Sequence, residues 1–306
     1  MGGASYGPTW QSPDPILRKL GVKYLHVGGD WWNRCHGGTW ARDAAAAARD
    51  GTGASWLNID EAFSSEKMGS LTANQIATDD KGGHNMMVAF RADTRLPFLS
   101  NSVQLIYTEH MLEHLIPMQG GVAFIRELYR LLVPGGVLRL STPDLALYMC
   151  AYVRPPAGLR RHRHFLRSHG NRFAPDRAYQ LGDEYISDAS VVNNIFRNYG
   201  HQHVYDFDEF LRAAELAGVN ASAVCRSDLE ARGLPPPLRR AVRRATEPAN
   251  GSLACWLDQK VRSDESLYVH LQKGEAWPQP HRTGVDQNGR KPFCQPVPGD
   301  WGPCII

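Results

Sequence analysis

The sequence lacks any apolar run of the roughly 20 residues that cross a bilayer. Its first residues, MGGASYGPTW, have neither the basic nor the apolar segment of a secretory signal. Six cysteines form no Cys-x-x-Cys pair, which argues against a zinc knuckle or a disulfide framework and favours reduced thiols. A net charge of +3 is too small to indicate nucleic acid by itself. These absences predict a cytoplasmic protein without a membrane segment.

The stretch from Arg91 to Asp144 combines strand and helix patterns. Val103–Tyr107 is a short apolar run, which is typical of a covered parallel strand. Apolar residues then recur at helical spacing, and Pro134-Gly135-Gly136 ends that helix before Val137–Leu140 forms the next strand. A strand, a helix and a strand at this spacing predict a right-handed crossover in an α/β sheet.

Similar patterns flank this unit. Earlier strands are predicted at Val22–Gly28, Ser55–Ile59 and Met86–Phe90, with an alanine-rich helix at Arg42–Arg49 and an irregular segment at 64–85. Asp206 is expected to cap a helix over Phe207–Ala217. Val219–Cys225 and Ser266–Leu271 are expected to form a closing antiparallel hairpin.

Several short motifs of the central stretch follow one another in a fixed order and spacing. They are Asp93, Leu96-Pro97-Phe98, Glu109-His110, Leu112-Glu113-His114-Leu115, Leu132-Val133-Pro134-Gly135-Gly136 and Pro143-Asp144. With these residues the chain resembles the class I S-adenosylmethionine-dependent methyltransferases, and among them the type 11 group that acts on small molecules. The resemblance implies a Rossmann-like, doubly wound mixed sheet of seven strands with helices on both faces.

The same resemblance suggests the domain organisation. An N-terminal arm (1–20) would precede the methyltransferase domain (21–273), and a Pro/Gly-rich tail (274–306) would follow it. A helical or irregular insertion at about 145–205 would cover the substrate.

The resemblance further implies a site for the cofactor S-adenosyl-L-methionine and its product S-adenosyl-L-homocysteine. Ligands of open α/β sheets bind at the carboxyl ends of the strands. A carboxylate after the second strand, Asp60 or Glu61, would accept both ribose hydroxyls, and Asp93 would accept the adenine amino group. The expected cofactor-binding residues are Val27, Gly28, Gly29, Asp60, Glu61, Ala92, Asp93, Leu96, Glu109 and His110.

Methyl transfer requires alignment of the acceptor and, for some acceptors, removal of a proton. Histidine suits this role because its ordinary pKa lies near neutrality. The candidates are His201, His110 and His114, with Glu113 as a partner. His201 is preferred because it lies in the half of the chain expected to cover the substrate, although any of the three could instead be a structural core residue.

Two rival functions stay open. His110-x-x-Glu113-His114 also spells the zinc motif of inverted metallopeptidases, with Glu184 as a distant third ligand. Pro117 would cut short the helix that this motif needs, so no metal is expected under the favoured interpretation. A catalytically inactive methyltransferase fold is the other rival, because Gly28-Gly29-Asp30 departs from the fuller glycine signature of the family.

Residues 145–175 contain no Asp or Glu but several arginines. This run is either a solvated face or a lid that attracts an anionic small-molecule acceptor. Leu234–Arg244 is a second basic patch. Both patches could contact phosphates, but the chain has no Asn-Pro-Pro-Tyr-type base-flipping motif, so nucleic acid is not the expected partner. The sequence does not indicate the oligomeric state.

Overall fold

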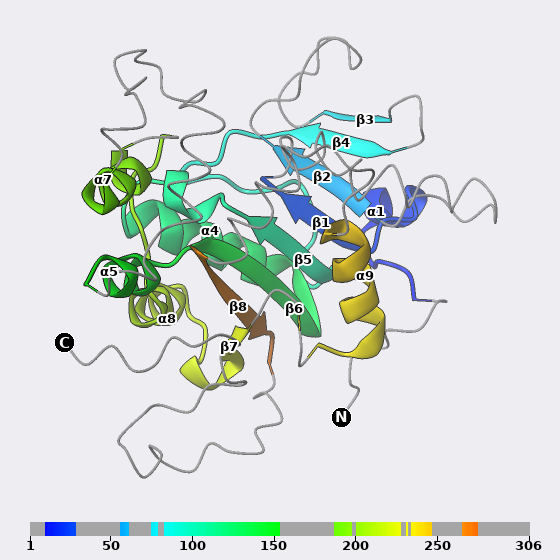
Figure 1. Cartoon of the computed structure of the whole chain (residues 1–306). Helices are drawn as coiled ribbons and strands as arrows, with labels where there is room; N and C mark the ends of the chain where they lie inside the picture. The colour runs from blue at the N-terminus through cyan, green and yellow to red at the C-terminus, as the bar shows by residue number, and fades with distance from the viewer. Residues whose placement is uncertain are drawn as a thin grey trace.

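An eight-stranded mixed sheet with the order β3-β4-β2-β1-β5-β6-β8-β7 forms the centre of the protein (Figure 1). The computed structural model describes residues 10–28, 56–60, 75–78, 83–153, 187–197, 200–227, 231, 234–246 and 265–274. The strands are β1 (Tyr24–Val27), β2 (Trp56–Asp60), β3 (Ile76–Thr78), β4 (His84–Met87), β5 (Val103–Glu109), β6 (Leu132–Pro143), β7 (Val224–Ser227) and β8 (Ser266–Gln272).

The strand directions confirm a doubly wound mixed sheet. β4, β2, β1, β5 and β6 pair in parallel, whereas β3 and β8 pair antiparallel to their neighbours. β1 lies between β2 and β5, so the order of the strands reverses beside β1. In such sheets the crevice at the reversal binds ligands at the carboxyl ends of the strands.

Helices cover both faces of the sheet. The helices are α1 (Pro15–Lys19), α4 (Gln119–Leu131), α5 (Leu145–Val153), α7 (Asp188–Arg197), α8 (Phe207–Leu216) and α9 (Pro236–Thr246), with 3-10 turns η1 (Leu112–His114) and η4 (Ala221–Ala223). Ile106 packs in one core cluster with residues of α4 and α8, whereas its neighbour Leu105 packs in another with residues of α9. Successive residues of a strand point to opposite faces, so α4 and α8 lie opposite α9.

The strand count is one higher than predicted, because part of the segment expected to be irregular forms β3. This strand has three residues and pairs antiparallel with β4 at the edge of the sheet. The predicted strand at Met86–Phe90 is shifted, since β4 covers His84–Met87. The polar Asn85 takes a buried strand position because its side-chain oxygen accepts a hydrogen bond from the Asn58 amide at 3.1 Å.

Pro134-Gly135-Gly136 is a bulge within β6, not the turn that was expected. α4 ends at Leu131 and β6 begins at the next residue. The pairing with β5 shifts from Val103–Leu132 to Leu105–Val137, and Gly135 has a φ of 78°. Extra residues on one strand are accommodated in this way with a local bend.

The later predictions are largely confirmed. The Asp206 side chain accepts a hydrogen bond from the Glu209 amide at 2.8 Å and caps α8. β7 and β8 form the expected antiparallel pair, but the strand predicted at Val219–Cys225 begins only at Val224, because Ala221–Ala223 form the 3-10 turn η4. The expected helix at Arg42–Arg49 lies outside the described residues. Within the described ranges, no helix is both long and apolar enough to cross a bilayer. The expectation of reduced thiols is wrong for Cys225, which is disulfide-bonded.

A row of polar side chains crosses the sheet at a single level. Each member is the register partner of the next, in the order Asn85, Asn58, His26, Tyr107, Arg139 and His270. His26 stacks on Tyr107 with ring centroids 5.1 Å apart, and an Arg139 guanidinium nitrogen lies 2.8 Å from His270 Nε2. All members are buried, so hydrogen bonds and stacking across the strands replace contact with water.

Candidate active site

The carboxyl end of β1 opens into a glycine turn. Gly28 follows the last strand residue, and its N–H donates to the Ile59 carbonyl at 2.8 Å. Its φ of 79° lies in the left-handed region that favours glycine. A Cβ at this position would lie 2.8 Å from the Met111 Cβ, so the turn also contacts the loop after β5. This turn brings bare backbone to the edge of the sheet, as the predicted cofactor contact requires.

Asp60 ends the neighbouring strand at the same edge. Val27 and Ile59 are register partners, so Gly28 and Asp60 follow them side by side. The Asp60 carbonyl accepts a hydrogen bond from Val88 N–H at 2.8 Å, which fixes the strand end. Gly29 and Glu61, the other residues expected here, lie outside the described residues. A bare turn beside a carboxylate fits the nucleoside and the charged chain of the expected cofactor.

Two further expected cofactor residues lie in a turn, and a third lies in the core. Ala92 and Asp93 are exposed between β4 and β5. Leu96 is buried, and its N–H donates to Glu127 Oε1 at 2.8 Å. Arg130 holds the other Glu127 oxygen at 2.8 Å, so Leu96 is fixed by α4.

The end of β5 carries a buried acid and a strained histidine. Glu109 accepts a hydrogen bond from the Tyr107 hydroxyl, and burial together with Glu109 raises the pKa of Tyr107. His110 follows with a φ of 49°, which side chains other than glycine rarely adopt. Its Nε2 lies 2.8 Å from Ser266 Oγ on β8. Strained backbone of this kind clusters at functional sites.

Glu113 lies at the centre of a histidine cluster. The side chain is fully buried, and its Oε2 accepts a hydrogen bond from Thr142 Oγ1 at 3.0 Å. Oε1 lies 3.1 Å from His110 Nδ1. Burial raises the pKa of Glu113, but His110 and then the other two histidines lower it to about 2. The carboxylate is therefore ionised at neutral pH.

His201 reaches this carboxylate from a distant part of the chain. The amides of Gln202 and His203 donate to the Glu113 carbonyl at 2.7 and 3.1 Å, which docks the segment. His201 Nδ1 lies 2.7 Å from the Ile195 carbonyl and so must donate to it. Nε2 lies 3.9 Å from Glu113 Oε1. Burial lowers the pKa of His201, so its Nε2 carries a lone pair at neutral pH.

The structure thus brings together His110, Glu113, His114 and His201. The His114 and His201 rings meet edge-on with centroids 4.8 Å apart. The single helix that the peptidase motif needs is absent here. Leu112–His114 form one 3-10 turn, and His110 lies before it. His110 and His114 therefore do not share a helix face, and Glu184 lies outside the described residues.

Sequence reasoning missed the hydroxyl groups that hold this cluster. Thr142 lies near the end of β6, and Ser266 begins β8. Both face the end of β5 because β6 pairs with β5 on one side and with β8 on the other. Thr142 stands just before the Pro143-Asp144 pair, which is the only sequence signal for its position.

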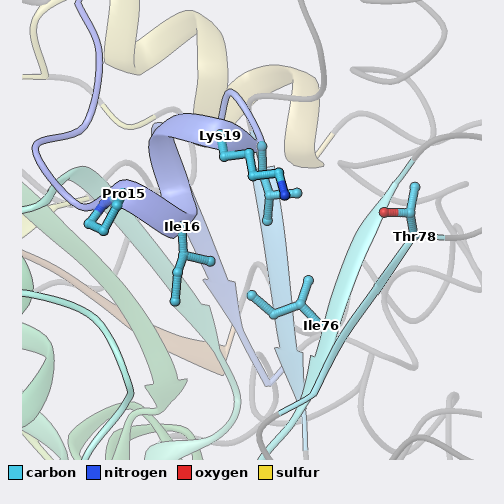
Figure 2. A pocket seen from close by; sticks show the side chains of 6 residues that line it. Pro15, Ile16, Lys19, Ile76 and Thr78 are labelled. Atoms are coloured by element: carbon cyan, nitrogen blue, oxygen red, sulfur yellow. The ribbon is translucent and has the colours of Figure 1, made fainter.

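A pocket of about 430 Å³ lies elsewhere, between α1 and the edge strand β3 (Figure 2). It is lined by Pro15, Ile16, Lys19, Leu20, Ile76 and Thr78. Thr78 pairs with His84, the first residue of β4, so the pocket lies away from the carboxyl ends of the strands. Its walls are mostly apolar and hold no acid or histidine, so the chemistry belongs to the other edge.

Comparison with known proteins agrees with this placement. The model of a family described as "Methyltransferase domain" matches residues 51–140. Over these residues the chain is similar to the class I, type 11-like methyltransferases. The cofactor expected from this similarity is S-adenosyl-L-methionine. The matched segment contains β2, β4, β5 and η1, which supply part of the site, whereas Gly28, Thr142, His201 and Ser266 lie outside it.

Solved structures give remote matches, and no curated protein matches the chain. An S-adenosylmethionine-dependent methyltransferase from Mesorhizobium loti is 16% identical, with 85% of this chain and 96% of that chain covered and a TM-score of 0.38. One from Archaeoglobus fulgidus is 9% identical, with coverages of 84% and 91% and a TM-score of 0.36. Geranyl diphosphate C-methyltransferase from Streptomyces coelicolor is 13% identical, with coverages of 82% and 70% and a TM-score of 0.34. These scores carry no argument about the substrate.

Proposed function

We propose that this protein transfers the methyl group of S-adenosyl-L-methionine to an oxygen, nitrogen or sulfur atom of a small-molecule acceptor. One observation carries the proposal. A bare glycine turn and a carboxylate end neighbouring strands, and a buried Glu–His cluster lies at the carboxyl end of the next strand. This arrangement offers a cofactor site and a set of acid–base groups at one edge of the sheet.

On the cofactor side, the backbone at Gly28 and the carboxylate of Asp60 would hold the nucleoside. The bound cofactor supplies a methyl group on a positively charged sulfur. Glu109 is buried at the end of β5, next to β1, and accepts a hydrogen bond from the Tyr107 hydroxyl. This bond would hold the Glu109 side chain in place beside the cofactor. Asp93 would contact the adenine if its exposed turn closes over the ligand.

On the acceptor side, His201 would act through Nε2. Its other nitrogen is engaged by the Ile195 carbonyl, which fixes the ring and leaves Nε2 as an acceptor. The residue arrives from the segment before α8, not from the strands that would hold the cofactor. His201 would therefore orient or activate the acceptor without binding the cofactor. The domain boundaries at 21 and 273, with a covering insertion at 145–205, form part of the same proposal.

An anionic acceptor is the favoured class. The arginine-rich segment 154–172 lies outside the described residues, so its support comes from composition alone. A stretch of this length without any acid would attract anions and keep them near a neighbouring site.

Binding of S-adenosyl-L-homocysteine to Asp60 variants tests the proposal. Asp60→Asn should weaken calorimetric affinity by about 1.5–3 kcal/mol, the usual loss for hydrogen bonds to a charged group. Asp208→Asn is the matched control, because Asp208 lies in the first turn of α8 and far along the chain from the strand ends. Equal affinities of both variants and the unmodified protein would reject the assignment. A methyl-release assay over a panel of small acceptors would then identify the substrate class.

A further inference from the structure

We propose that Glu113, His114 and His201 bind a divalent metal ion, with zinc as the best match. The set offers two imidazole nitrogens and one carboxylate oxygen, a combination that zinc accepts readily. One potential ligand atom from each residue lies within 4.8 Å of the others. Ligand atoms around one tetrahedral zinc lie about 3.3–3.5 Å apart. Small side-chain rotations would therefore close the site.

The orientation of His201 is that of a metal ligand. Its Nδ1 donates to the Ile195 carbonyl at 2.7 Å, and its Nε2 points to Glu113 Oε1 at 3.9 Å. Histidines that bind metals usually donate their second ring nitrogen to a carbonyl or a carboxylate in this way.

Glu113 supplies the independent observation. Its side chain is fully buried, and its Oε1 faces two ring nitrogens, His110 Nδ1 at 3.1 Å and His201 Nε2 at 3.9 Å. The other oxygen is held by Thr142 Oγ1 at 3.0 Å, so the carboxylate cannot turn Oε1 elsewhere without losing that bond. A fully buried carboxylate needs a compensating positive charge nearby, which a bound cation would supply.

His110 is placed beside the ion but not in the ligand set. Its Nε2 already contacts Ser266 Oγ at 2.8 Å, and its Nδ1 approaches Glu113 at 3.1 Å. His110 would therefore support the carboxylate. This arrangement differs from the zinc motif in the sequence, which would pair His110 with His114 and use Glu113 as a base.

Three protein ligands leave a coordination position open. Closed structural zinc sites use four protein ligands, whereas sites that bind water or a substrate use three. This last step rests on the proposed function: the open position would take an oxygen, nitrogen or sulfur atom of the methyl acceptor. With the ion bound, His201 Nε2 would hold the metal, so His201 would act on that atom through the cation and not as a proton acceptor. The cation would orient the atom at the edge of the sheet where the cofactor turn also lies.

Zinc titration of the untagged, full-length protein tests the site. The cysteines are first alkylated, so that thiolates cannot bind the metal, and the protein is then stripped with a chelator. Calorimetry should show one zinc per chain. His201→Ala and His114→Ala should each weaken binding by about 100-fold or more, because even the loss of a residue that only supports a ligand costs 10–100-fold.

His203→Ala is the matched control. His203 lies two residues from His201 and also contacts a carboxylate, Glu209, at 3.0 Å, but it is not part of the cluster. Its zinc affinity should equal that of the unmodified protein. A stripped protein that takes up no zinc, or a His201→Ala protein that binds zinc as tightly as the control, would overturn the proposal.

X-ray absorption of the zinc-loaded, unmodified protein avoids any loss of folding in the variants. Two imidazole ligands and no sulfur would support the site, and fewer than two imidazoles would overturn it. Titration of the same samples with S-adenosyl-L-homocysteine tests the proposed function separately, because Gly28 and Asp60 do not belong to the cluster.

Discussion

Gly28 lies so close to Met111 that a Cβ at position 28 would approach the Met111 Cβ to 2.8 Å. The two residues belong to different strand ends, since Gly28 follows β1 and Met111 lies between β5 and η1. The expected cofactor turn and the loop that carries Glu113 are therefore in direct contact. A substitution that moves one of these loops must therefore also move the other.

The first prediction concerns Gly28→Ala. The added methyl group would clash with Met111, and alanine is strained at a φ of 79°. We expect lower stability in urea unfolding and weaker binding of S-adenosyl-L-homocysteine by calorimetry. Gly218→Ala is the control, because Gly218 has a φ of 91° but no atom within 4 Å of an added Cβ. That variant should lose only about 1–2 kcal/mol, the backbone cost alone, and keep its affinity. Equal effects of the two variants would refute the role of the Met111 contact.

The second prediction separates His201 from the cofactor. His201→Ala should keep the affinity for S-adenosyl-L-homocysteine within about twofold and reduce turnover about 100-fold or more, the scale of a lost acid–base group. His203→Ala should retain turnover, because His203 pairs with Glu209 outside the cluster. Loss of cofactor binding in His201→Ala, or its failure to fold by circular dichroism, would show that His201 is structural.

The third prediction concerns stability against pH. Burial lowers the pKa of His26 to about 4 from its ordinary value of 6.5, so the folded protein keeps the ring neutral where the unfolded chain takes up a proton. Stability from this group is complete above pH 6.5 and is lost as the pH falls towards 4. Burial and then Arg139 lower the pKa of His270 as well, which acts in the same direction.

His26→Phe keeps an aromatic ring against Tyr107 and removes the titration. Between pH 7 and pH 5, the unmodified protein should lose about 2 kcal/mol more unfolding free energy than the variant. Urea unfolding at both pH values measures this difference. Parallel losses in the two proteins would mean that His26 takes up a proton as readily in the folded protein as in the unfolded chain.

The fourth prediction concerns the arginine-rich segment. Joint replacement of Arg160, Arg161 and Arg163 by alanine should raise KM more than it lowers kcat, because uniform binding of an anionic acceptor would be lost. KM of the unmodified protein should also rise with salt, since exposed charges are screened over about 8–10 Å. Joint replacement of Arg239, Arg240 and Arg243 of α9 by alanine removes the same three charges and controls for net charge. A KM that responds to neither salt nor the triple replacement would identify the segment as a solvated face.

Much of the sheet could be predicted from the sequence because its strands are apolar and end in recognisable turns. β1, β2 and β5 fall where short apolar runs stand before Gly28, Asp60 and Glu109. The same strand ends indicated the edge at which the site would lie. These features are local, so one stretch of sequence is enough to see them.

The other features of the fold and the site depend on contacts between segments that are distant in the sequence. β3 has only three residues and is defined by its pairing with β4. His84 and Asn85 look unsuitable for a buried strand until their hydrogen bonds to other segments are known. The link between Glu113 and His201 arises because the segment after α7 docks on η1, and no local pattern encodes it.

The polar row from Asn85 to His270 also helps to determine the register of the strands. Each strand places one hydrogen-bonding or stacking group at a single level between apolar rows. If one strand slipped by one residue, its polar group would turn to the opposite, apolar face. The polar side chains of the two neighbouring strands would then lose their hydrogen-bonding or stacking partner. Wrong registers are therefore less stable than the native one, so we expect the central strands to pair in one cooperative folding step.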